Sequence, residues 1–209
     1  MQFEVKEEEL ELLSDKAIYW RKHRMLIVAD LHIGKAAHFR KYGIQVPSLV
    51  ERNNLWRLSG LILKKKPKKI LFLGDLSHSE KNAAWDEFAD FCQNLPEVEL
   101  ILVKGNHDII RPINFLRAKI EVVDECLLGP FLFTHDRVDS KHYNFHGHIH
   151  PAVILRGRGR QSLRVPCFFF STQFAVLPSF GDFTGSFVLN PKKGDAVFYP
   201  GEREVIRVF

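Results

Sequence analysis

The sequence lacks the features that mark membrane, secreted and disulfide-bonded proteins. No apolar run reaches the roughly eighteen residues of a membrane-spanning helix, and the nearest, over residues 167–177, is interrupted by Ser, Thr and Gln. The N-terminal residues do not combine a basic segment with an apolar one, as a signal peptide would. The cysteines are three, far apart and without a CxxC pair, which indicates reduced packing residues: Cys92, Cys126 and Cys167. We therefore expect a cytoplasmic protein without a membrane partner.

Length and composition are those of an ordinary globular protein. A chain of 209 residues can bury one substantial core, and we expect residues 1–209 to form one domain. The net charge of +5 conceals an asymmetry, because residues 1–15 carry a net −5 and the remaining 194 residues carry +10. This basic body is compatible with a polyanionic partner such as nucleic acid, although basic proteins of this size are also common.

The first 120 residues alternate apolar strand-like runs with helix-like segments. Strands are predicted at residues 2–5, 10–13, 17–20, 25–29, 70–73 and 98–103. A spacing near 3.6 residues predicts helices from Pro47 to Ile62, over residues 83–94, and over residues 109–120. Residues 34–46 are polar, aromatic and basic, too irregular for a core element. Alternating strands and helices indicate parallel strands joined by right-handed crossovers.

Beyond residue 120 the pattern changes to short strands without long helices. These are predicted at residues 131–134, 143–145, 151–155, 163–170, 183–189, 196–199 and 204–208. Residues 156–161 form the turn of a hairpin, and the last three segments alternate like antiparallel strands. The predicted fold class is α/β (α+β), a two-layer mixed β-sheet sandwich flanked by helices.

Polar side chains follow three of the predicted buried strands. Asp30 and His32 come after residues 25–29, where an extended backbone would point both to the same side. Asp75 follows residues 70–73, and Gly105-Asn106-His107-Asp108 follows residues 98–103. Because the carboxyl ends of parallel strands meet at one edge of a sheet, these loops are expected to gather there.

Three further histidines follow the later strands. His135 comes after residues 131–134, and His148 and His150 share an extended face beside Gly147, which leaves room for close backbone approach. Oxygen and imidazole donors without thiolate suit Mn, Fe, Zn or Ni better than a closed structural zinc site. Seven ligands are too many for one ion and fit two ions that share a carboxylate. Two such ions can hold a bridging hydroxide and clamp both oxygens of a phosphoryl transfer.

In order and spacing, these motifs resemble the calcineurin-like metallophosphoesterases. The resemblance implies that one metal is held by Asp30, His32 and His150, and the other by Asn106, His135 and His148. It further implies that Asp75 bridges the two ions. His107 would protonate the leaving oxygen or stabilise charge on the phosphoryl group, with Asp108 orienting it. A histidine suits that task because its pKa lies near the working pH.

One branch of the family is closer still. The segment from Asp30 to Lys35, the following His38-Phe39-Arg40, and residues 43–47 and 160–168 resemble the DNA-ligase-associated metallophosphoesterases, which are similar to the catalytic part of SbcD-type nucleases. This resemblance implies two divalent ions, with manganese as the first candidate metal. It also implies that the substrate is DNA and that the protein acts in DNA repair. It also implies association with a DNA ligase or helicase, while the oligomeric state stays open.

The surroundings of the metals decide the substrate. Residues 34–46 could form a wall over the site, with Lys35, His38 or Arg40 on phosphate, or a solvated loop. His78 could line the site or cap a helix. The segment from Arg156 to Arg164 carries four arginines and no acid, so Arg158 and Arg160 could track a nucleic-acid backbone or form a solvated turn.

Three functions follow from these alternatives. The first is a DNA endonuclease or phosphodiesterase. The second is a small-molecule phosphoesterase acting on cyclic nucleotides, nucleotide-sugar lipids or phosphomonoesters, for which a closed pocket would be expected. The third is a non-enzymatic scaffold, against which the presence of His107 argues.

Overall fold

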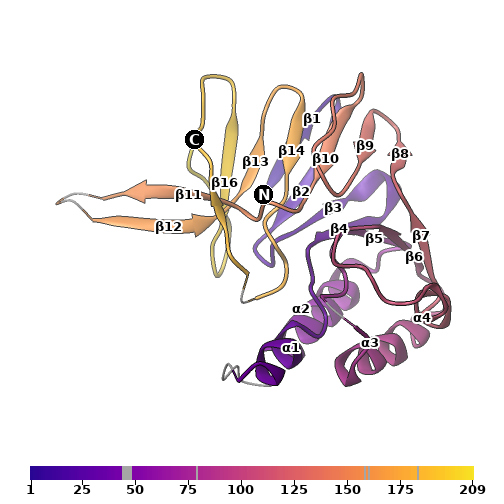
Figure 1. The fold of residues 1–209 in the computed structure, drawn as a ribbon. Helices are drawn as coiled ribbons and strands as arrows, with labels where there is room; N and C mark the ends of the chain where they lie inside the picture. Colours follow the sequence, from indigo (N-terminus) through magenta and orange to yellow (C-terminus); the bar gives the residue numbers. More distant parts are fainter. Residues whose placement is uncertain (44–48, 79, 158, 160, 183) are drawn as a thin grey trace.

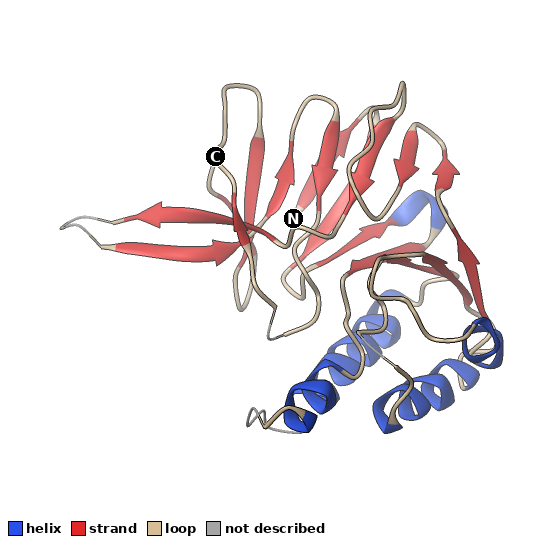
Figure 2. Ribbon diagram, in the orientation of Figure 1, coloured by secondary structure: helices blue, strands red, loops and turns tan. Residues whose placement is uncertain are grey.

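The computed structural model describes residues 1–209 except 44–48, 79, 158, 160 and 183. Two seven-stranded sheets lie against one another, and the helices cover the outer face of one of them (Figures 1 and 2). A third, three-stranded sheet projects from the second as an arm. No helix among the described residues has the length and apolar character to cross a membrane.

The first sheet carries the strands that lead into the candidate site. Its order is β1 (Gln2–Val5), β2 (Glu8–Leu13), β3 (Ala17–Trp20), β4 (Met25–Ala29), β5 (Lys69–Leu73), β6 (Glu99–Val103) and β7 (Ile120–Val123). The strands from β1 to β4 pair antiparallel, with the 3-10 helix η1 (Arg21–His23) before β4. The strands from β4 to β7 pair parallel, as the crossover pattern predicted. Their carboxyl ends therefore meet at one edge.

Four α-helices accompany this sheet: α1 (Lys35–Lys41), α2 (Leu49–Lys65), α3 (Ala83–Gln93) and α4 (Pro112–Arg117). Helix α3 begins where the Asn82 side chain accepts hydrogen bonds from the backbone of Ala84 and Trp85, at 3.1 and 3.2 Å. Its residues spaced by three and four then face the sheet: Trp85, Phe88, Ala89 and Cys92. One apolar core joins α2, α3 and α4 to the sheet.

The second sheet has the order β17 (Val205–Arg207), β16 (Ala196–Pro200), β13 (Phe168–Phe170), β14 (Phe174–Val176), β10 (Tyr143–His146), β9 (Phe131–Phe133) and β8 (Cys126–Leu128). The core between the two large sheets is rich in aromatic rings, with Phe131 packed 4.9 Å from Trp20 and 4.8 Å from Phe145. Burial of each such ring stabilises the fold by about 1.5–3 kcal/mol. The two layers are therefore held together by an extensive apolar interface.

The arm consists of β12 (Ser162–Pro166), β11 (Pro151–Arg156) and β15 (Phe187–Val188). Strands β11 and β12 form the predicted hairpin, which Figure 1 shows extending away from the sheets. The predicted strand at residues 163–170 is divided at Cys167, because its first part joins the arm and its second part joins the other sheet.

The two-layer mixed architecture is confirmed, three local expectations are corrected, and a fourth lies outside the described residues. Residues 35–41 form helix α1, which the mixture of polar and aromatic residues concealed because, of its side chains whose burial is described, only Ala36 is deeply buried. The helix expected over residues 109–120 is limited to Pro112–Arg117, since Ile120 already belongs to β7. Strand β15 is shorter than residues 183–189 and pairs parallel with β11. The α2 helix is described from Leu49, and its expected start at Pro47 lies outside the described residues.

Candidate metal centre

The loops after β4, β5 and β6 are connected to one another through backbone and side-chain hydrogen bonds. The backbone N–H of Asp30 donates to the carbonyl of Gly74 at 3.2 Å, and that of His32 donates to the carbonyl of Asp75 at 2.9 Å. The backbone N–H of His107 donates to the Asp75 carboxylate at 2.9 Å. The predicted gathering of these loops at one sheet edge is what the structure shows.

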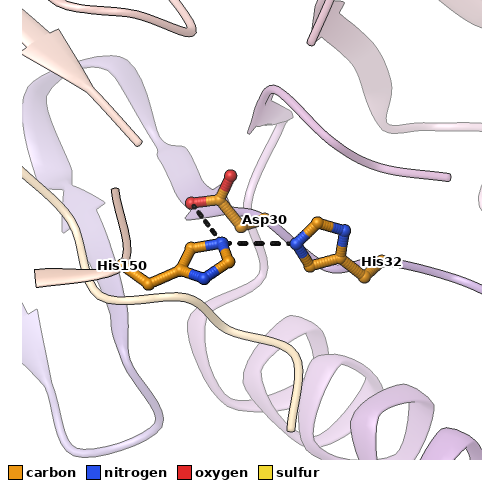
Figure 3. Close-up of side chains that lie close together, drawn as sticks. All are labelled: Asp30, His32 and His150. Carbon is orange, nitrogen blue, oxygen red and sulfur yellow. Dashed lines mark hydrogen bonds and ion pairs between the residues drawn. The ribbon is translucent and has the colours of Figure 1, made fainter. Parts of the chain in front are cut away.

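A first group of donors consists of Asp30, His32 and His150 (Figure 3). The Nε2 atoms of His32 and His150 are 3.2 Å apart, and the His150 Nε2 lies 3.8 Å from the Asp30 carboxylate. One donor atom from each residue lies within 4.8 Å of the others. This is a spacing at which three ligands can reach one ion.

A second group consists of Asp75, His135 and His148. The His148 Nδ1 lies 3.0 Å from the His135 Nε2, which is itself 3.4 Å from the Asp75 carboxylate. The two groups also touch, because the backbone N–H of His148 donates to both oxygens of Asp30, at 3.1 and 3.2 Å. The geometry thus places two candidate ion sites side by side, with three donors from the first sheet and three from loops after β9 and β10.

The backbone brings these donors together in a way that strand periodicity did not predict. Five of the six have positive φ angles: Asp30, His32, Asp75, His148 and His150, at 52°, 52°, 44°, 67° and 48°. Neither Asp30 and His32 nor His148 and His150 therefore lie on extended backbone, contrary to expectation. A non-glycine residue in this left-handed region costs about 1–3 kcal/mol, and such strain concentrates at functional sites.

Two glycines allow the close approach of the loops. A Cβ on Gly74, whose φ is 76°, would lie 1.8 Å from the His135 ring. A Cβ on Gly147 would lie 2.7 Å from the Asp30 carboxylate, in agreement with the space expected there. Larger residues at either position would displace a donor.

The electrostatics of the first group favour a bound cation. Burial, reinforced by the neighbouring Asp75, raises the pKa of Asp30 well above its ordinary value. Burial lowers the pKa of His32, and it lowers that of His150 to about 4, so both rings are neutral near pH 7. The His150 Nδ1 is 3.1 Å from the carbonyl of Gly185, which can only accept, so this nitrogen carries the proton. The His150 Nε2 then presents a lone pair toward His32, as a metal ligand would.

Asp108, which the sequence analysis expected to orient His107, is fixed by hydrogen bonds to two loops. It is buried, and its carboxylate accepts hydrogen bonds from the Ser77 backbone at 2.8 Å, the Ser77 hydroxyl at 3.1 Å and the Gly105 backbone at 2.8 Å. Burial raises the pKa of Asp108 to about 6 in spite of these donors. The side chain therefore ties the loop after β6, which carries His107, to the loop after β5.

The exposed His107 lies at one end of a row of rings. Its imidazole stacks on His78 with centroids 4.8 Å apart and planes inclined by 26°. His78 lies 5.3 Å from His38, and His38 lies 4.9 Å from the exposed ring of Tyr42. His38 and His78 are thus close to the donors, as the substrate-contact hypothesis requires.

The remaining predicted residues lie at the periphery or outside the described part. Asn106 is exposed in the loop between Gly105 and His107, and Arg40 is exposed near the end of α1. Arg158 and Arg160 lie outside the described residues.

Two groups were missed by the sequence analysis, namely the Gly185 carbonyl and the Ser179 hydroxyl. The Ser179 hydroxyl donates to the Asp30 carbonyl at 2.9 Å. A carbonyl leaves no signal in a sequence, and Ser179 follows no motif.

A family model described as calcineurin-like phosphoesterase matches residues 23–175, which include all six donors. The chain belongs to the calcineurin-like phosphoesterases. This phosphoesterase is accordingly a metal-dependent hydrolase of phosphoesters, and its two donor groups are candidate sites for divalent ions. The resemblance inferred from the sequence motifs is confirmed at the level of the family.

One solved structure supports the same assignment. A crystal structure of the Pseudomonas putida nuclease MPE is 34% identical, with a TM-score of 0.84, and the alignment covers 100% of this phosphoesterase and 99% of that chain. Yfce, a phosphoesterase from E. coli, is 15% identical over 88% of this chain and 97% of its own, with a TM-score of 0.43. No curated protein matched the sequence.

Proposed function

We propose that this phosphoesterase is a DNA nuclease that hydrolyses phosphodiester bonds within the strand, with two manganese ions, during DNA repair. The observation that carries the proposal is that the donor groups lie at an open surface. Asn106 and His107 are exposed at their rim, and His148 and His150 are partly exposed. A long polymer can reach donors in this position. The full-length similarity to a protein described as a nuclease supports the same substrate.

The donors divide between the two ions as follows. Asp30, His32 and His150 would hold one ion, Asn106, His135 and His148 would hold the other, and Asp75 would be shared between them. When bound, the ions supply Lewis acidity toward the phosphoryl oxygens and lower the pKa of a coordinated water. The Asp75 carboxylate lies at the centre of this arrangement, because it also accepts the backbone N–H of His107.

His107 is proposed to act on the reacting phosphate. Its ring is exposed beside the donors, and its backbone is fixed by the Asp75 carboxylate. It would protonate the leaving oxygen or stabilise charge on the phosphoryl group. Stacking on His78 limits the directions in which the ring can turn. Asp108 contributes by holding the loop that carries it.

The substrate contacts are proposed on the α1 side of the centre. Burial lowers the pKa of Lys35, while Asp75 and Asp30 favour its charged form. Together with His38, Arg40 and His78 it forms a cationic and aromatic border along which a phosphate backbone could lie. Arg158 and Arg160, which lie outside the described residues, are proposed from the sequence to extend this track.

The experiment that tests the function is hydrolysis of labelled single- and double-stranded DNA beside bis-p-nitrophenyl phosphate, with manganese, at low and moderate salt. We expect DNA cleavage that weakens with salt and disappears in Asp75→Ala. The matched control is Asp139→Ala, because that side chain is 99% exposed and lies outside the centre. Internal product lengths would identify an endonuclease. Turnover of the small diester with intact DNA would instead indicate a small-molecule phosphoesterase.

The repair role and the association with a DNA ligase or helicase rest on the family branch that the sequence motifs resemble. Deletion of the gene should then sensitise cells to DNA-damaging agents. Complementation should require the wild-type chain and fail with Asp75→Ala. Equal survival of deleted and intact strains would contradict the role in repair.

A further inference from the structure

A pocket of about 220 Å³ lies next to the first donor group and is separate from the α1 side proposed to contact substrate. His150 forms part of its wall. Lys16 reaches it from the turn between β2 and β3, Arg164 reaches it from β12 of the arm, and Asp182 and Gly185 belong to the loop after β14. The pocket is therefore built by both large layers and the arm at once.

The charges around this pocket favour an anion. The Asp182 carboxylate is shared by two cations, with Lys16 Nζ at 3.3 Å and an Arg57 nitrogen at 3.5 Å. Arg57 is held in place by the Asn54 side chain at 2.9 Å and by the Phe180 carbonyl. Arg164 adds a second cation to the pocket wall, which Arg57 does not line. Two cations and one carboxylate in the described wall leave net positive charge.

Burial lowers the pKa of Lys16, and Arg57 adds to this effect, while Asp182 opposes it. The positive charge of the Lys16 ammonium group is therefore only partly balanced by the Asp182 carboxylate. An anion placed beside it would stabilise its charged form.

A residue of the pocket wall contacts one of the metal donors. The Gly185 carbonyl in its wall is 3.1 Å from the His150 Nδ1 and fixes the orientation of that ring. A group bound in the pocket would therefore lie directly beside a candidate ligand of the first ion. This position suits the part of a polynucleotide that is adjacent to the phosphate undergoing hydrolysis.

We infer that this pocket binds the phosphate group next to the scissile one, with Lys16 and Arg164 as positioning residues; this inference rests on the proposed nuclease function. Its volume is below the range of about 300–1,000 Å³ that encloses a whole small-molecule ligand. It suits a phosphate with part of a sugar. The guanidinium of Arg164 can contact two phosphate oxygens, and the ammonium of Lys16 acts as a point charge.

The test compares inhibitors of bis-p-nitrophenyl phosphate hydrolysis in the manganese-loaded protein. Thymidine 3′,5′-bisphosphate carries two phosphates, whereas the 5′- and 3′-monophosphates carry one. We expect the bisphosphate to bind roughly tenfold or more tightly than either monophosphate, as one charge-assisted contact would give. The ratio of the monophosphate inhibition constant to the bisphosphate inhibition constant should approach one in the double variant Arg164→Ala with Lys16→Met.

Two further variants keep the result interpretable. Arg203→Ala removes one positive charge, as Arg164→Ala does, but from an exposed turn between β16 and β17. This variant should keep the wild-type ratio. Arg164→Ala alone changes an exposed side chain and should lower the ratio even if the double variant folds poorly.

Measuring DNA cleavage by the wild-type protein in parallel separates the two proposals. If DNA is cleaved and the bisphosphate has no advantage, or keeps its advantage in the Arg164 and Lys16 variants, the phosphate pocket is overturned and the nuclease function stands. If DNA stays intact and the advantage is lost in those variants, the anion pocket is supported and the DNA substrate is contradicted.

Discussion

The Nε2 atoms of His32 and His150 lie 3.2 Å apart, although 118 residues separate them in the chain. The Gly185 carbonyl fixes the proton of His150 on its other nitrogen, so the nitrogen facing His32 is an acceptor. The buried Asp30 carboxylate lies 3.8 Å from the same nitrogen. Donor atoms that converge in this way are complementary to a cation.

Manganese should therefore stabilise the folded protein. An ion at one hundred times its dissociation constant adds about 2.7 kcal/mol to the free energy of unfolding. The measurement is thermal unfolding of chelator-treated protein with increasing manganese. His150→Ala should reduce the increase in melting temperature, and His142→Ala, in the loop before β10, should leave it intact. Equal increases in both variants would remove His150 from the ligand set.

His107→Ala should lower kcat/KM for bis-p-nitrophenyl phosphate by about 10²–10⁴, the usual contribution of a proton-transferring side chain. Metal stabilisation should persist, because the hydrogen bond from His107 to Asp75 is made by the backbone N–H, which the substitution keeps. Steady-state kinetics together with the manganese melting curves separate these effects. Unchanged turnover would exclude His107 from the reaction, and lost metal stabilisation would make its role structural.

Asp108→Ala should destabilise the protein by about 1–3 kcal/mol, because the buried Ser77 and Gly105 N–H groups lose their acceptor. Urea denaturation measures the change. Asp139→Ala, at a side chain that is 99% exposed, is the control and should stay within about 0.5 kcal/mol of wild type. Equal stability of the two variants would show that the loop does not depend on Asp108.

The metal-free protein should lose stability as the pH falls from about 6.5 to about 4. Burial depresses the pKa of His32, and it lowers the pKa of three other histidines from 6.5 to about 4: His78, His146 and His150. In this window the unfolded chain takes up protons that the folded protein does not hold, so acidification favours unfolding.

The raised pKa values of Asp30 and Asp108 act in the opposite direction, because the folded protein protonates these carboxyls first. Burial also lowers the pKa values of His23 and His135, so six rings against two carboxyls leave net proton uptake on unfolding. Urea midpoints of chelator-treated protein at pH 6.5, 5.5 and 4.5 check the sign. Midpoints that rise on acidification would show that the carboxyls dominate.

Much of the site could be predicted because its residues follow strands. Asp30, Asp75 and His107 come directly after apolar runs, and parallel pairing carries them to one edge whatever the details of the loops. Their local conformation could not be predicted, since alternation assumes extended backbone and Asp30 has a φ of 52°. That conformation depends on tertiary contacts such as the hydrogen bond from Asp30 to Gly74.

Other features depend on contacts that no local pattern records. The expectation for Asp108 assumed a side-chain partner next to it in sequence, whereas its partner Ser77 lies 31 residues away. The pocket of Lys16, Arg164 and Asp182 joins three segments that carry no motif. Helix α1 was missed because it is short and mixed in composition, and, of its side chains whose burial is described, only Ala36 is deeply buried.

The two layers of the fold contribute equally to the centre, three donors from each. The second layer is completed by strands β13, β14, β16 and β17, and Gly185, which orients His150, lies in that same late part of the chain. A chain synthesised only as far as β10 therefore cannot assemble the complete centre, and the ions should slow unfolding rather than speed folding. Hydrolytic activity would thus be withheld until these later strands have been synthesised.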